Sequence, residues 1–110
     1  MNDPLPSARL QLDHRQVHFL RTELAAGFVF AAVANKKYDN QDRASAQLSL
    51  LHGEQAYETV DVFLVTHQQR MSNKEIQELT AGLRTLREKL DELKRQFPSE
   101  TITDAQTGRL

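Results

Sequence analysis

Cysteine is absent from this chain of 110 residues. Without a thiol there is no disulfide, no thiolate nucleophile and no thiolate metal ligand, so thiol catalysis, zinc ribbons and iron–sulfur clusters are excluded. The chain also lacks a G-x-S-x-G elbow, a Walker loop and a G-x-G-x-x-G turn, which removes the usual local signatures of a serine hydrolase or a nucleotide-binding site. We therefore expect no catalytic residue, no cofactor and no enzymatic activity.

A bias toward basic residues is missing as well. The formal net charge is −1, and the basic residues near the end of the chain alternate with acidic ones, as in Arg87-Glu88-Lys89. A nucleic-acid-binding protein usually carries a basic face or stripe. Mixed charges are typical of a solvated helix face, so we expect no nucleic-acid partner.

Long apolar segments are missing too. The first six residues, Met1 to Pro6, do not combine a basic region with an apolar run, so we expect no secretory signal and a cytoplasmic location. The longest apolar stretch is Leu24 to Ala34, about half of what a helix needs to cross a bilayer. We expect neither a membrane span nor a membrane partner.

One strong pattern is present, in the last third of the chain. Apolar residues recur at alternating spacings of three and four, the heptad pattern by which one helix packs lengthwise on another. These seam residues are Ile76, Leu79, Leu83, Leu86, Leu90, Leu93 and Phe97. The pattern predicts a long helix with a helical neighbour, from about residue 73 to about residue 97.

The start of this helix has a sequence signature of its own. Ser72 and Glu75 form a capping box, in which each side chain bonds to the backbone N–H of the other residue. Met71 and Ile76 occupy the two positions of a hydrophobic staple around that cap. Pro98 closes the other end, because proline disfavours a helical residue before it.

Two further helices precede the seam. Apolar residues at helical spacing predict one helix from about Arg9 to about Lys37 and a second from about Asp42 to about Gln69. Asn40 or Asp42 is expected to cap the second helix. Gly27 and Gly53 lie inside the two helices, where glycine is unfavourable, so we expect each to permit the close approach of a neighbouring helix or to mark a bend.

The predicted fold is an all-α, three-helix up-down-up bundle, with one helical domain over residues 8–97 between flexible segments 1–7 and 98–110. The short loop before Ser72 predicts an antiparallel hairpin of the second and third helices. Placing Leu64 opposite Leu79 in that hairpin sets Glu54 near Lys89, and it sets Glu58 near the turn 84–87.

The first two helices carry more apolar residues than one hairpin needs. Large apolar patches are uncommon on soluble monomers, so a core shared by two chains would explain the surplus. We therefore expect a homodimer, or a complex with another protein, formed by the first two helices. The interface candidates are Leu24, Phe28, Phe30, Val33, Leu48, Leu51, Val62 and Val65.

Metal binding has only a partial signature. His14 and His18 are four residues apart and so share one helix face. A stable transition-metal site needs three or four ligands, and the next residues on that face, Arg21 and Thr22, are poor ones. We expect these histidines to be surface residues and the chain to hold no metal.

The chain shows a resemblance over residues 40–97. A helix with Ala56-Tyr57-Glu58-Thr59-Val60, a polar turn with Ser72-Asn73-Lys74-Glu75 and the leucine-spaced helix resemble small uncharacterised bacterial all-helical proteins and, loosely, tetratricopeptide-type helical hairpins. The chain departs from the tetratricopeptide pattern because it has no second copy, no tryptophan and longer helices. The resemblance implies a helical scaffold that binds protein or itself, and it transfers no functional residue.

Two functions are compatible with these features. The first is a non-enzymatic interaction or oligomerisation module, supported by the seam and by the surplus apolar faces. The second is a small regulator or sensor that binds a ligand or a metal between its helices.

Overall fold

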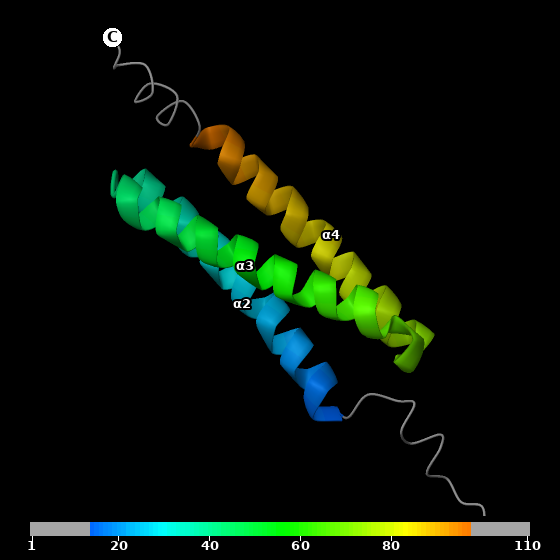
Figure 1. Cartoon of the computed structure of the whole chain (residues 1–110). Helices are drawn as coiled ribbons and strands as arrows, with labels where there is room; N and C mark the ends of the chain where they lie inside the picture. The colour runs from blue at the N-terminus through cyan, green and yellow to red at the C-terminus, as the bar shows by residue number, and fades with distance from the viewer. Residues whose placement is uncertain (1–13, 98–110) are drawn as a thin grey trace, which may run out of the picture.

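A computed structural model of the chain describes residues 14–97, which form three long α-helices and one short 3-10 helix (Figure 1). The helices are α2 (His14–Asp39), α3 (Arg43–His67) and α4 (Asn73–Gln96), and the 3-10 helix η1 (Gln68–Arg70) joins α3 to α4. The predicted all-α fold of three long helices is confirmed. The predicted flexible segments 1–7 and 98–110 lie outside the described residues.

The helix starts follow from local hydrogen bonds. Asp42 caps α3 by accepting from the backbone N–H of Ser45 at 3.2 Å, which selects Asp42 from the two predicted caps. At α4, Glu75 N–H donates to Ser72 Oγ at 3.1 Å, and Ser72 N–H donates to a Glu75 carboxylate oxygen at 3.0 Å. The capping box is therefore confirmed, and with Met71 buried beneath it the chain turns sharply into α4.

The turn between α2 and α3 contains an unusual backbone conformation. Gln41 has a φ of 68°, in the left-handed region that normally favours glycine after a helix. Its N–H donates to the carbonyl of Tyr38 at 2.9 Å, and the N–H of Asp42 donates to the carbonyl of Lys37 at 2.9 Å. These bonds satisfy carbonyls at the end of α2 and reverse the chain within a few residues.

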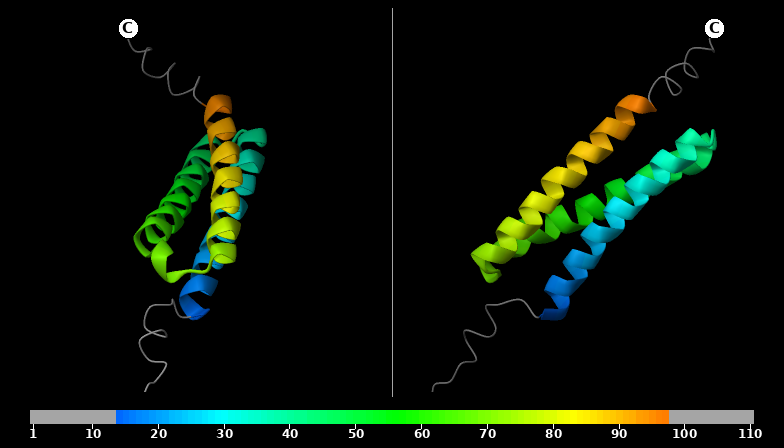
Figure 2. Two further views of the ribbon diagram at one scale, coloured as in Figure 1. Left: turned by 90° about the vertical axis from the view of Figure 1, so that its right-hand side faces the viewer. Right: turned by 180° about the vertical axis from the view of Figure 1, so that it is seen from behind.

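The most extensive helix pairing is between α2 and α3, and α4 lies across both (Figures 1 and 2). This corrects the predicted arrangement, in which the second and third helices formed the main hairpin. Small residues are the physical reason, because they let α2 and α3 approach each other: a Cβ on Gly27 would lie 3.3 Å from Ala56 Cβ, and one on Gly53 would lie 3.6 Å from the backbone oxygen of Gly27. Of the two predicted roles of the glycines, the close approach of a neighbouring helix is confirmed, since a Cβ on Gly27 or Gly53 would lie within 3 Å of a leucine of α4.

The leucine seam of α4 forms the centre of the core, together with apolar residues of α2 and α3. Leu86 packs against Gly27 of α2, and Leu90 packs against Gly53 of α3. The seam thus faces its own chain. Its buried members are Leu79, Leu83, Leu86, Leu90, Leu93 and Phe97.

The direction of the helices follows the up-down-up prediction. α3 runs against α2, and α4 runs in the same direction as α2 (Figure 2). The parallel pair is held at both ends. Arg21 of α2 donates to both carboxylate oxygens of Glu78 on α4, at 2.7 and 2.9 Å, and the rings of Tyr38 and Phe97 stack with centroids 4.4 Å apart.

Candidate functional site

The large apolar side chains that remain exposed in residues 14–97 all belong to α2 and α3. They include five of the eight predicted interface residues: Val33, Leu48, Leu51, Val62 and Val65. Phe28 and Phe30 are half-buried, and Leu24 packs in the core beside Gly82 of α4, so Leu24 cannot take part in docking. The structure adds Phe19 and Val29, which are 47% and 59% exposed.

Some residues of this surface recur every seven positions along α2 and along α3. Phe19, Ala26 and Val33 are seven residues apart on α2, and Leu48, Gln55 and Val62 repeat the spacing on α3. Residues seven apart lie two helical turns from one another on nearly the same line. Each helix therefore carries one straight row, and neither row contains a charged residue.

An aromatic contact joins the two rows. The rings of Phe30 on α2 and His52 on α3 lie with centroids 5.1 Å apart. We call the two rows and this contact the outer face: Phe19, Ala26, Phe30, Val33, Leu48, His52, Gln55 and Val62. These eight residues are all exposed or half-buried on α2 and α3.

The α3–α4 side has a different chemistry, built around one carboxylate. Glu54 accepts from Arg87 at 3.0 and 2.7 Å and lies 2.8 Å from the Lys94 ammonium. The Arg87 guanidinium also contacts Asp91 at 2.9 Å and lies over the Tyr57 ring, 4.8 Å from its centroid. Hydrogen bonding to Arg87 holds the pKa of Glu54 below its ordinary value, although partial burial opposes the shift.

This cluster confirms the predicted attraction between the second and third helices and corrects its partners. Glu54 faces Arg87 and Lys94 instead of Lys89, which lies between α4 and α2. Glu58 lines a shallow depression made by α3 alone instead of facing the turn 84–87. The cluster joins two helices, and its residues Tyr57 and Arg87 also line an open cavity between α3 and α4.

The histidines are dispersed over the two apolar helices. His18 Nε2 lies 3.5 Å from Thr22 Oγ1, and His14 is the first residue of α2. His67 stacks on Phe63 with centroids 4.4 Å apart. Within residues 14–97, no three histidine, aspartate or glutamate side chains lie close enough together to hold a metal ion.

The apolar character of α2 is higher than the expectation of no membrane span implies. By length and composition alone this helix of 26 residues could cross a membrane, although 33% of its most apolar stretch is buried against the other helices. A core helix of a soluble protein passes the same test. The uninterrupted run from Leu24 to Ala34 is short, but the apolar average over α2 is high because few charged residues flank that run.

No protein-family model matches this chain, and neither does a curated protein or a solved structure. The resemblance drawn from the sequence therefore holds at a coarser level, that of a small all-helical protein of three helices.

Proposed function

We propose that this chain is a non-enzymatic helical module that self-associates through its outer face. The single observation that carries the proposal is the pair of uncharged rows with seven-residue spacing, on α2 and on α3. Seven-residue repeats keep the same positions turned toward a partner helix along its whole length. The outer face is thus patterned for helical neighbours.

The outer face supplies about half of a standard dimer interface. Its rows span residues 19–33 and 48–62, and at 1.5 Å per residue and about 10 Å per helix the face measures about 21 by 20 Å. The resulting area of about 420 Å² compares with the ~800 Å² that each partner buries in a standard interface, so a dimer would also bury the exposed apolar neighbours Val29, Leu51 and Val65.

A second copy of the chain fits this surface on chemical grounds. A two-fold axis brings the same patch of both copies together, so any net charge in the patch would repel itself. The eight residues of the outer face include no lysine, arginine, aspartate or glutamate, and the two charges on the line of Phe30, Glu23 and Lys37, are of opposite sign. Because α2 and α3 are antiparallel, a two-fold axis along the pair sets each α2 against the partner's α3, and the four helices enclose a second core.

Mass measurement tests the proposal. We expect light scattering on the full chain at tens of micromolar to give twice the 12.6 kDa of one chain. Val62→Glu places a charge in the outer face, where the side chain is 55% exposed, so it should yield a folded monomer. Gln77→Glu, an equal change at an exposed position of α4, should remain a dimer.

Two outcomes would overturn the proposal. One is a monomer mass for the unaltered chain, and flotation of that monomer with lipid vesicles would assign the apolar face to a membrane surface. The other is a dimer that Val62→Glu leaves intact, which would place the interface elsewhere.

A further inference from the structure

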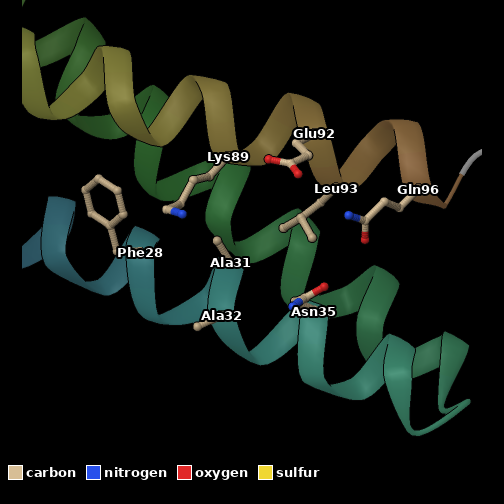
Figure 3. A pocket seen from close by; sticks show the side chains of 8 residues that line it. All are labelled: Phe28, Ala31, Ala32, Asn35, Lys89, Glu92, Leu93 and Gln96. Atoms are coloured by element: carbon tan, nitrogen blue, oxygen red, sulfur yellow. The ribbon is translucent and has the colours of Figure 1, made fainter.

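A groove lies between the second halves of α2 and α4, on the side of α2 away from the outer face (Figure 3). Its volume is about 380 Å³, within the 300–1,000 Å³ range of small-molecule sites. Its lining residues are Phe28, Ala31, Ala32 and Asn35 of α2 and Lys89, Glu92, Leu93 and Gln96 of α4.

Two tight contacts between the same helices bound this groove along its length. Below it, a Cβ on Gly27 would come within 2.6 Å of Leu86 Cδ2, and above it the rings of Tyr38 and Phe97 stack. Between these points α2 presents the small side chains Ala31 and Ala32 to α4. The groove is therefore a packing gap beside small residues, and a tight contact between α2 and α4 bounds it at each end.

The groove combines an apolar floor with unpaired polar groups. Ala31 and Leu93 are 3% and 6% exposed and form the floor, and Phe28 adds an aromatic wall. Lys89 and Glu92 have no ion-pair partner within residues 14–97, in contrast to Arg87 and Lys94 on the neighbouring face of the same helix. The α4 rim of the site thus offers a free cation and a free anion beside an apolar floor.

Figure 3 shows how these groups are distributed. Lys89 reaches from α4 toward α2 at the Phe28 end, and Glu92 lies on the same rim. Leu93 occupies the middle, and the amides of Asn35 and Gln96 lie at the other end. Lys89 is therefore toward the Phe28 end of the apolar floor, and Glu92 lies on the rim beside Leu93.

We infer that this groove binds a free α-amino acid with a large side chain. Lys89 would bind the carboxylate and Glu92 the ammonium group, and the side chain would lie over Ala31 and Leu93 toward the two amides. A zwitterion satisfies both charges at once, whereas a simple acid or amine would satisfy one and leave the other next to a like charge. The inference does not depend on self-association, because the outer face contributes no residue to the groove.

Titration of the full chain, followed by amide NMR shifts, tests this inference with L-phenylalanine and L-leucine as probes. Ligands of this size at ordinary efficiency bind with a Kd of about 1 mM, so we expect saturation at about 10 mM and shifts at residues 28–35 and 89–96. Glycine, which lacks a side chain, should bind more weakly. N-acetyl-L-phenylalanine and L-phenylalaninamide each lose one charge and should also bind more weakly.

Variants give the test its control. Lys89→Met and Glu92→Gln should each weaken binding about fivefold, as expected for loss of one exposed charge contact. Ala32→Leu should fill the groove and abolish binding, while Arg95→Met, at an exposed position of α4 outside the groove, should bind like the unaltered chain. The inference is overturned if neither amino acid shifts these residues, if the N-acetyl compound binds equally well, or if the two charge variants retain full affinity.

Discussion

Arg87 on α4 donates two parallel hydrogen bonds to the carboxylate of Glu54 on α3, one at 3.0 Å and the other at 2.7 Å. The side chains keep 28% and 25% of their surface exposed, so the pair is neither a surface ion pair nor a buried one. A two-bond contact of this kind fixes orientation as well as distance. It therefore sets the rotation of α4 relative to α3, which the leucine seam alone leaves adjustable.

Removing the charge of Glu54 should weaken the fold without abolishing it. We expect Glu54→Gln to lower the free energy of unfolding by about 1–2 kcal/mol, between the values for exposed and buried pairs, because Lys94 loses its ion pair and Arg87 keeps only Asp91. Urea unfolding followed by circular dichroism measures this. Glu88→Gln, at an exposed position of α4, should change stability by less than about 0.5 kcal/mol, and equal effects of the two variants would contradict the assigned role.

Acid should destabilise the protein through a small set of carboxylates. The pKa of Glu54 is lowered by Arg87, that of Glu78 by Arg21 and that of Asp42 by its hydrogen bonds to Ser45. A lowered pKa in the folded state gives stability that is present above the unfolded-state pKa, about 4 for these groups. That stability is lost as the pH falls from there through the folded-state pKa.

The unaltered chain should therefore melt at a similar temperature between pH 7 and pH 5 as far as these groups are concerned, and at progressively lower temperatures below about pH 4. Glu54→Gln should show a shallower decrease over that acidic range, since one of the contributing groups is gone. Melting temperatures at four pH values decide this, and parallel curves for the two proteins would exclude Glu54 as a contributor.

Gly27 should not tolerate alanine, although alanine favours helix. The added methyl group would lie 2.6 Å from Leu86 Cδ2 and 3.3 Å from Ala56 Cβ, and Leu86 is fully buried. Overpacking costs about 1–3 kcal/mol against a gain in helix propensity of about 1 kcal/mol, so we expect a net loss of about 1 kcal/mol in urea unfolding. Ala25→Gly, at an exposed position of α2, measures the propensity term by itself. A gain in stability for Gly27→Ala would show that the helices are farther apart than described.

Gln41 should be improved by glycine. Its φ of 68° is costly for a residue with a Cβ, and the greater freedom of glycine in the unfolded chain cancels part of the benefit. We expect Gln41→Gly to raise the free energy of unfolding by about 0.5 kcal/mol, measured in urea. The matched change Gln47→Gly, inside α3 and exposed, should lower it by about 1 kcal/mol. Loss of stability in both variants would argue against the left-handed turn.

The partner of Glu54 shows where sequence reasoning ends. The sequence predicted that an acidic α3 would face basic residues of α4, and the structure bears this out, but it replaces Lys89 by Arg87 and Lys94. Two residues along a helix rotate the side chain by about 200°, so Lys89 projects toward α2. To predict which basic residues of α4 face α3, one needs the positions of α2 and α3 around α4. The spacing of residues along the sequence does not give these positions.

The capped start of α4 and its buried seam were predictable because each depends on residues close together in the sequence. The dominant pairing of α2 with α3 was not, since it depends on small residues such as Gly27 and Ala56 meeting across two helices. The same limit applies to the apolar surface. Leu24 was predicted as an interface residue but is buried under α4, whereas Phe19, which was not predicted, is exposed.

The odd number of long helices in residues 14–97 determines where the two ends of the helical region lie. Because α2 and α4 run in the same direction (Figures 1 and 2), the chain enters the helical region at one end and leaves it at the other. The 24 residues of α4 span about 36 Å. The start of α2 and the end of α4 therefore lie at opposite ends of the bundle, separated by about the length of one helix.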